Sequence, residues 1–134
     1  MNPAFKNRVW ELEVFPPWLV EDCDHCIEIT QPDGTGAMHI SSARKKEGAV
    51  EEAETLAQLK DDCPDGVEFT KARCGDFVGY VAEYVDWHTD KFWRKWFVAC
   101  RQDLLFVTYT CARGEEELEV ERASALLASL RSKV

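Results

Sequence analysis

The sequence predicts an α+β domain in which one antiparallel sheet of about six to seven strands packs against two helices. Segments with alternating apolar and polar residues come in two runs, and the connections within each run are short. Each run is followed by a segment whose apolar residues recur every three or four positions. The predicted order is therefore βββ-α-ββββ-α. With 134 residues and no linker or repeat, residues 1–134 form a single predicted domain.

The first predicted strand covers residues 8–15. Trp10, Leu12 and Val14 lie on one face of this segment, and more polar residues alternate with them. The pair Pro16-Pro17 ends the strand, because proline has no backbone N–H to donate to a neighbouring strand.

The next two strands are predicted at residues 26–31 and 37–43. The turn Pro32-Asp33-Gly34-Thr35-Gly36 separates them and has the residue types that tight turns need. These two strands are therefore expected to form a hairpin. The apolar residues Trp18–Val20 are interpreted as a plug that follows the proline turn.

The first helix is predicted at residues 50–61. Acidic residues occupy its first turns, where the helix dipole favours negative charge, and Cys63-Pro64-Asp65-Gly66 ends it. Four residues share the spacing of a buried stripe: Val50, Ala53, Leu56 and Ala57.

Four more strands are predicted, at residues 67–73, 76–86, 91–101 and 104–111. Their connections are short, so successive strands should be antiparallel neighbours.

The last helix is predicted at residues 115–132. It begins with glutamates and ends with basic residues, which suits the helix dipole at both ends. Its buried stripe is predicted to contain Leu118, Val120, Ala123, Leu126, Leu127 and Leu130. We expect the two helices to cover one face of the sheet and to leave part of the other face exposed.

Charge and composition exclude several classes of function. The formal net charge is −9. A field of this sign repels nucleic acids and anionic membranes, so neither is a predicted partner, whereas a basic protein would be attracted. The sequence has no signal peptide and no segment apolar enough to span a membrane. We therefore expect a cytoplasmic protein whose six cysteines are reduced.

Several segments together resemble the PsbP-like fold, which the DcrB-type bacterial proteins and the Ran-release factor Mog share. The resemblance rests on Trp10-x-Leu12-x-Val14-x-Pro16-x-Trp18, Pro32-Asp33-Gly34-x-Gly36 with Ala37–Ser41, Trp93–Val98, and Leu105–Tyr109 with Ala128–Arg131. It implies a binding or accessory role and carries no functional residue across. The chain departs from the DcrB type, which is usually a lipoprotein, because it has no export signal or lipobox cysteine.

The motif Cys23-Asp24-His25-Cys26 has the spacing of a redox pair or of two zinc ligands. A redox pair normally lies at a helix N-terminus, but Cys26 leads directly into a predicted strand. A closed zinc site needs four ligands, and only Cys63 and Cys74 could supply the others. We therefore interpret these cysteines as structural and predict neither a metal nor a cofactor.

No set of residues has the spacing of an active site. His88 lies in a turn between Asp86 and Asp90, which is typical of a solvated histidine. No Ser-His-Asp set, carboxylate pair or phosphate-binding loop is recognisable. The chain is therefore predicted not to be an enzyme.

Aromatic residues form the first candidate binding surface. Along residues 91–101 one face carries Arg94 and the other carries Trp93, and both faces are partly apolar. If the helices leave a sheet face open, aromatic residues there would resemble the anchors of protein interfaces. The candidates are Trp87, Trp93, Tyr80, Tyr84 and Arg94.

The second candidate surface is the acidic segment around the first helix. Glu51, Glu52 and Glu54 lie in its first turns, and further acids follow as far as Asp65. Such a cluster forms either a solvated helix face or a docking surface for a basic protein.

These observations predict a non-enzymatic protein-binding or accessory domain of bacterial type. An immunity or accessory factor for a toxin or secretion effector is the specific form of this prediction. The alternative is a small-ligand or metal-binding domain that uses an aromatic sheet face or the Cys23/Cys26 pair.

Overall fold

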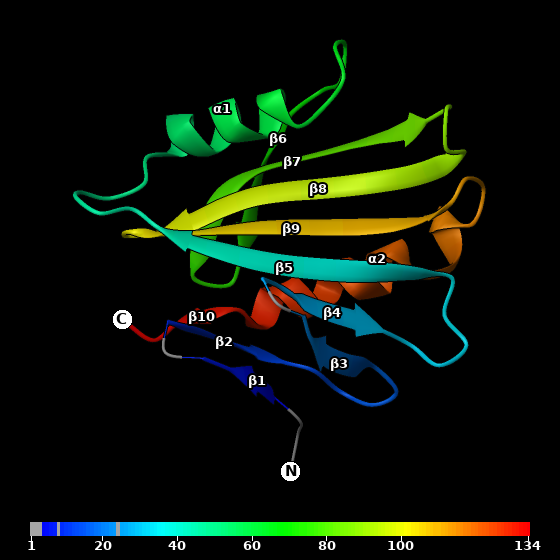
Figure 1. Ribbon diagram of the computed structural model, residues 1–134, viewed down its shortest axis with the longest axis horizontal. Coiled ribbons are helices and arrows are strands. Elements are labelled where there is room, and N and C mark those ends of the chain that lie inside the picture. Colours follow the sequence, from blue (N-terminus) through cyan, green and yellow to red (C-terminus); the bar gives the residue numbers. More distant parts are fainter. Residues whose placement is uncertain (1–3, 8, 24) are drawn as a thin grey trace.

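A computed structural model describes residues 4–7, 9–23 and 25–134 and confirms the α+β class. Its larger sheet has seven strands in the order β3-β4-β5-β9-β8-β7-β6, and all neighbouring pairs are antiparallel (Figure 1). The strands are β3 (Leu19–Asp22), β4 (Ile27–Thr30), β5 (Gly36–Arg44), β6 (Thr70–Cys74), β7 (Phe77–Asp86), β8 (Lys91–Cys100) and β9 (Asp103–Ala112).

A second, smaller sheet contains β1 (Ala4–Lys6), β2 (Trp10–Glu13) and β10 (Arg131–Ser132) in the order β1-β2-β10. The strand predicted at residues 8–15 therefore exists, but it does not belong to the large sheet, and Arg8 lies outside the described residues. Of the residues expected to form an apolar plug, Leu19 and Val20 begin β3, and Trp18 precedes the strand and packs against the core. Both differences involve strands of four residues or fewer, which have too few positions for alternation to be recognised.

The two helices, α1 (Glu52–Asp61) and α2 (Glu116–Leu126), lie on opposite faces of the seven-stranded sheet. Lys95 of β8 bonds to Asp62 at the end of α1, whereas the adjacent Arg94 bonds to Glu121 and Ser124 of α2. Because successive strand residues point to opposite faces, the two helices cannot share one face. The prediction that both cover the same face is wrong, since β8 carries apolar residues on both sides and each side needs a cover.

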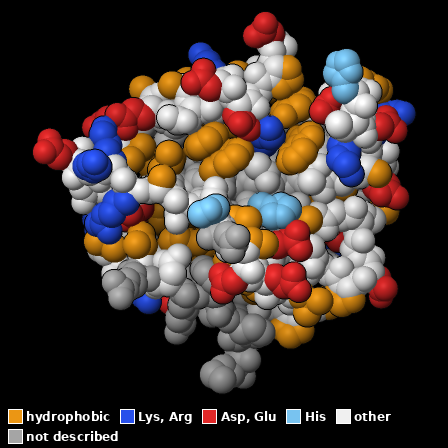
Figure 2. All heavy atoms as spheres, in the orientation of Figure 1, with side chains coloured by type: hydrophobic (Ala, Val, Ile, Leu, Met, Phe, Trp, Pro, Cys, Tyr) orange, Lys and Arg blue, Asp and Glu red, His pale blue; other side chains and the backbone are white. Residues whose placement is uncertain are grey.

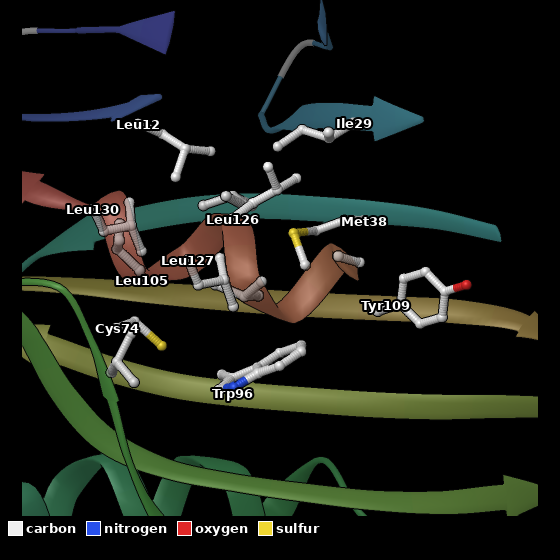
Figure 3. Packing of buried hydrophobic residues seen from close by; sticks show 14 of the residues in the cluster. Leu12, Ile29, Met38, Cys74, Trp96, Leu105, Tyr109, Leu126, Leu127 and Leu130 are labelled. Atoms are coloured by element: carbon white, nitrogen blue, oxygen red, sulfur yellow. The ribbon is translucent and has the colours of Figure 1, made fainter. Parts of the chain in front are cut away.

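The face under α2 is closed. The short second sheet and the turn η1 (Leu127–Ser129), which follows α2, complete its cover. Figure 3 shows Leu126, Leu127 and Leu12 packed over the side chains of the large sheet. The sheet contributes Ile29, Met38, Cys74, Trp96, Leu105 and Tyr109 to this core. We call this side the closed face.

The opposite side, which we call the open face, is covered by α1 over part of its area. Leu59 of α1 packs on Ala82 and Phe97, and Phe97 stacks on Phe106 with ring centroids 4.3 Å apart. Figure 1 shows α1 along one end of β7 and β8, while the other end of these strands has no helix above it. Two of the predicted aromatic residues, Tyr84 and Trp93, lie at the uncovered end of the open face.

The buried stripes of both helices differ from the predicted ones. In α1 the buried residues are Thr55 and Leu59, and Ala53 faces solvent. In the last helix and the turn after it, the other predicted members of the stripe are buried, but Leu118 is 60% exposed and Glu119 is buried beside Val120. Glu119 can be buried there because its carboxylate accepts three hydrogen bonds.

Candidate functional site

The register of β7, β8 and β9 gathers a group of side chains on the uncovered end of the open face. Tyr84 lies opposite Trp93, and Ala82 opposite Lys95. On the other side of β8, Thr110 lies opposite Trp93. Directly opposed residues of antiparallel strands point to the same face, so Tyr84, Trp93 and Lys95 form one cluster. We call these three residues the aromatic–lysine cluster.

Lys95 is the centre of this cluster. Its Nζ lies 2.8 Å from a carboxylate oxygen of Asp62 and donates to the Asp62 carbonyl at 3.2 Å. The same ammonium lies 4.9 Å from the ring centroid of Trp93 and 5.2 Å from that of Tyr84. These distances allow cation–π attraction to both rings. The ammonium thus holds both aromatic rings close to the C-terminal end of α1.

The charge on Lys95 is stable at neutral pH. Burial lowers the pKa of Lys95, but hydrogen bonds to Asp62 and Tyr84 and the charge on Asp62 more than offset burial, so its pKa is raised. Carbonyl groups at a helix C-terminus also favour a nearby cation. Because Asp62 neutralises Lys95, the cluster presents aromatic surface without a free positive charge.

Trp87 extends the aromatic surface beyond the end of the sheet. It lies in the turn between β7 and β8 and is 73% exposed. The guanidinium of Arg113 lies 5.0 Å from its ring centroid and also bonds to Asp90 at 2.6 Å. Arg113 therefore supports one side of the ring, and most of the Trp87 side chain is accessible to solvent.

The two remaining candidates for the aromatic surface, Tyr80 and Arg94, lie in different environments. Tyr80 lies opposite Phe97 and packs against the small core under α1, so it is not part of the aromatic–lysine cluster. Arg94 points to the closed face, as the alternation along residues 91–101 predicts. There it bonds to Glu83 at 2.9 Å and to Glu121 at 3.1 Å.

The acids of the first helix are only partly free. Glu52 pairs with Lys71 at 2.9 Å and Glu54 with Lys45 at 2.6 Å. The hydrogen bond from Lys45 lowers the pKa of Glu54, and Glu54 also accepts the backbone N–H of Glu51. Other acids nearby are exposed and form no ion pair with a described residue: Glu47, Glu51, Asp61, Asp65 and Glu68. The rim of the open face is therefore acidic.

Cys23 and Cys26 face each other across the β3–β4 turn. The Cys23 N–H donates to the Cys26 carbonyl at 2.7 Å, and the pair borders a hollow of about 390 Å³ together with His25. Partial desolvation raises the pKa of the Cys23 thiol, as do its hydrogen bond with Cys26 and the nearby carboxylates. A raised pKa keeps a thiol protonated and unreactive. Asp24 lies outside the described residues, which include no metal-binding group of three or more ligands.

A buried carboxylate on the closed face was not expected from the sequence. Glu119 is 2% exposed and accepts three hydrogen bonds, from the Tyr109 hydroxyl at 3.0 Å, the Gly36 N–H at 3.1 Å and the Thr35 N–H at 3.2 Å. Burial raises the pKa of Tyr109, so its hydroxyl stays protonated and donates. These bonds join α2 to the start of β5. The position of Glu119 beside the apolar residues of α2 was the only sequence signal for this site.

Comparisons with known proteins show the fold and no more. No family model and no curated protein matches the chain. A protein of Bacteroides thetaiotaomicron VPI-5482 with a solved crystal structure is similar, with a TM-score of 0.71 and 16% sequence identity. The match covers 99% of this chain and 49% of that one. The chain thus spans about half the length of its structural neighbour. Neither described helix is long and apolar enough to cross a membrane.

Proposed function

We propose that this chain is a non-enzymatic protein-binding domain that binds a basic partner on the uncovered end of its open face. The aromatic–lysine cluster is the observation that carries the proposal. Its two rings are half-buried and held by one neutralised ammonium, and the exposed Trp87 lies at the end of the same two strands. A few residues carry most of the binding energy in protein interfaces, and tryptophan and tyrosine are enriched among them.

The acidic rim supports a basic rather than a neutral partner. The chain carries a net charge of −9, and several acids next to α1 are exposed and unpaired among the described residues. Exposed charges at a rim add little affinity, but they accelerate association with a partner of opposite charge. In this proposal the aromatic residues provide most of the affinity, and the acidic residues increase the rate of association.

The specific form of the proposal is an immunity or accessory factor that pairs with a bacterial toxin or secretion effector in the cytoplasm. The resemblance to the PsbP-like fold supports it, since members of that fold are mostly binding or accessory proteins. The net charge also suits a basic effector as partner.

A small-ligand domain is the second candidate. A hollow of about 510 Å³ next to Tyr84 falls in the size range of ligand sites. Two of the residues lining it, Glu83 and Arg94, already pair with each other. A ligand there would have to compete with this ion pair, which makes the protein partner the better supported proposal.

The experiment begins with the partner that co-purifies after mild cross-linking in the native host. The purified partner is titrated by calorimetry against the wild-type chain and the variant Trp87→Ser. We expect Trp87→Ser to weaken binding by about tenfold or more. Leu118→Ser is the matched control, because Leu118 is also exposed and apolar but lies on α2.

A second pair of measurements tests the role of charge. Asp61→Asn combined with Asp65→Asn should slow association and reduce its salt dependence while leaving dissociation unchanged. A partner that is acidic, or one that binds Trp87→Ser and wild type equally well, would contradict the proposed function.

A further inference from the structure

The edge strand β7 extends past its neighbour. β6 pairs with β7 only from Cys74↔Phe77 to Thr70↔Val81, whereas β7 continues to Asp86. Among the described residues no strand pairs with the outer side of residues 82–86. We call residues 82–86 the free edge. In Figure 1 this part of β7 runs on toward the β7–β8 turn with no strand beyond it.

The register determines which backbone groups face outward there. Cys74 and Phe77 close a two-residue hairpin, so they form a hydrogen-bonded pair, and such pairs then alternate along the two strands. Val81 consequently bonds to Thr70, and the N–H and C=O groups of Glu83 and Val85 point in the same outward direction. No backbone hydrogen bond joins Glu83 or Val85 to the described loop residues. The free edge therefore presents unpaired donors and acceptors at the spacing of a strand.

Space for an added strand exists beside these groups. The chain that leads into β6 moves away from β7 and leaves the hollow of about 510 Å³, lined by Gly66–Glu68 and Thr70 on one side and by residues 81–84 on the other. A second hollow of about 370 Å³ lies farther along the same edge, between Pro64 and Trp87. An extended segment could place alternate side chains in these two hollows.

The charges around the free edge are mainly acidic. Glu83 and Glu68 are exposed, Asp86 is half-buried, and Asp65 lies in the loop next to Pro64. Arg94, the cation of the larger hollow, is already bonded to Glu83 and Glu121. The occupant that these charges favour is basic. A second copy of this chain is disfavoured, because each copy carries a net charge of −9 and would place acidic edges together.

We propose that the free edge of β7 binds an extended, basic segment of the partner by strand addition, in line with β6. The inference rests on the proposed function and specifies how the partner docks. Backbone bonds to Glu83 and Val85 would supply affinity, and the two hollows with their acidic borders would select basic and apolar side chains. The aromatic–lysine cluster lies beside this edge through Tyr84, so one partner could contact both.

The test uses a capped synthetic peptide of alternating lysine and valine. Nuclear magnetic resonance with isotope-labelled protein should show slower hydrogen exchange at the amides of Glu83 and Val85 when the peptide binds. Val85→Pro removes one outward N–H and should weaken binding about tenfold. N-methylation of alternate peptide amides should have a similar effect, and a peptide of alternating glutamate and valine should not bind.

Two variants serve as controls. Val20→Pro makes the same substitution on β3, the opposite edge strand of the sheet, and should leave peptide binding unchanged. Glu83→Lys keeps the backbone groups and reverses one charge, so it should weaken binding even if Val85→Pro fails to fold. Thermal unfolding establishes that each variant is folded.

Two results would overturn strand addition. One is a peptide that binds wild type, Val85→Pro and Glu83→Lys equally well. The other is a peptide that leaves the Glu83 and Val85 amides unprotected. If the native partner still loses affinity for Trp87→Ser in either case, the proposed function stands and only the docking mode is wrong.

Discussion

The two faces of the seven-stranded sheet are built from the same strands but covered to different extents. On the closed face, Leu105, Val107 and Tyr109 of β9 are fully buried under α2 and the second sheet. On the open face, α1 covers one end, and at the other end Trp93 and Tyr84 remain half-buried. Figure 2 shows hydrophobic side chains on the open face with charged ones among them. The comparison teaches that one sheet can bury one face completely and still leave part of the other face accessible for the binding proposed above.

Each face also buries a charged side chain, Glu119 on the closed face and Lys95 on the open face. Glu119 on the closed face is fixed by two backbone N–H groups and the Tyr109 hydroxyl. Lys95 on the open face is held by Asp62, whose side chain is 42% exposed, and by two aromatic rings. Glu119 therefore links α2 to β5 and β9 through buried hydrogen bonds. Lys95 instead pairs with Asp62, a carboxylate that is accessible to solvent.

The largest contrast is expected between two neighbouring leucines. Leu105→Ala should destabilise the fold by about 3 kcal/mol, because it leaves a cavity in the closed core. Leu104→Ala, one residue earlier on the half-covered face, should cost about 1 kcal/mol. Urea unfolding of both variants measures the difference. Equal losses would show that the two faces contribute equally to stability.

A smaller effect is expected from the closed-face carboxylate. Glu119→Gln keeps the side-chain volume but replaces one acceptor oxygen with a donor, so it should cost about 2 kcal/mol. The control Glu117→Gln, on the exposed side of the same helix, should stay within about 0.5 kcal/mol of wild type. Urea unfolding of the two variants measures this difference. An unchanged free energy of unfolding for Glu119→Gln would show that the Glu119 hydrogen bonds do not stabilise the fold.

The smallest effect is expected from Lys95. The variant Lys95→Met should change stability at neutral pH by less than about 1 kcal/mol, because Asp62 is substantially exposed. The pKa of Lys95 is raised above 10.5, so the stability that its charge contributes is present below that pH and is lost as the pH rises through the higher folded value. Wild type should thus lose more stability than Lys95→Met above pH 10.5. Parallel loss in both proteins would contradict this assignment.

Strands with a long alternating pattern could be predicted from the sequence. β7, β8 and β9 lie within a residue or two of their predicted limits, and the opposite orientations of Trp93 and Arg94 followed from alternation alone. The placement of the helices could not be predicted in the same way. Both faces of β8 are apolar, so periodicity shows that each needs a cover but does not say which helix supplies it.

Short or polar features were also missed. β3 and β10 are too short for a pattern, and the last helix ends earlier than predicted, at Leu126. Glu119 was missed because two of its three donors, the N–H groups of Thr35 and Gly36, are more than 80 residues away in the sequence.

The candidate surface was predicted in part. Trp93 and Tyr84 were expected on an open face, and the structure brings them together there. The hydrogen bond between Lys95 and Asp62 joins a strand to the end of a helix. The two residues are 33 positions apart, and the sequence does not show that they lie close together in the fold. The same is true of the free edge, which depends on where β6 stops relative to β7.

The pairing of β5 with β9 has a consequence for the order of folding. Strands β6 to β9 follow one another along the chain, so their contacts close only short loops. β5 joins β9 along its whole length, from Gly36↔Cys111 to Arg44↔Asp103, and this pairing closes a much longer loop. We therefore expect the β6–β9 meander to assemble first and the β3–β5 segment to dock late in the reaction.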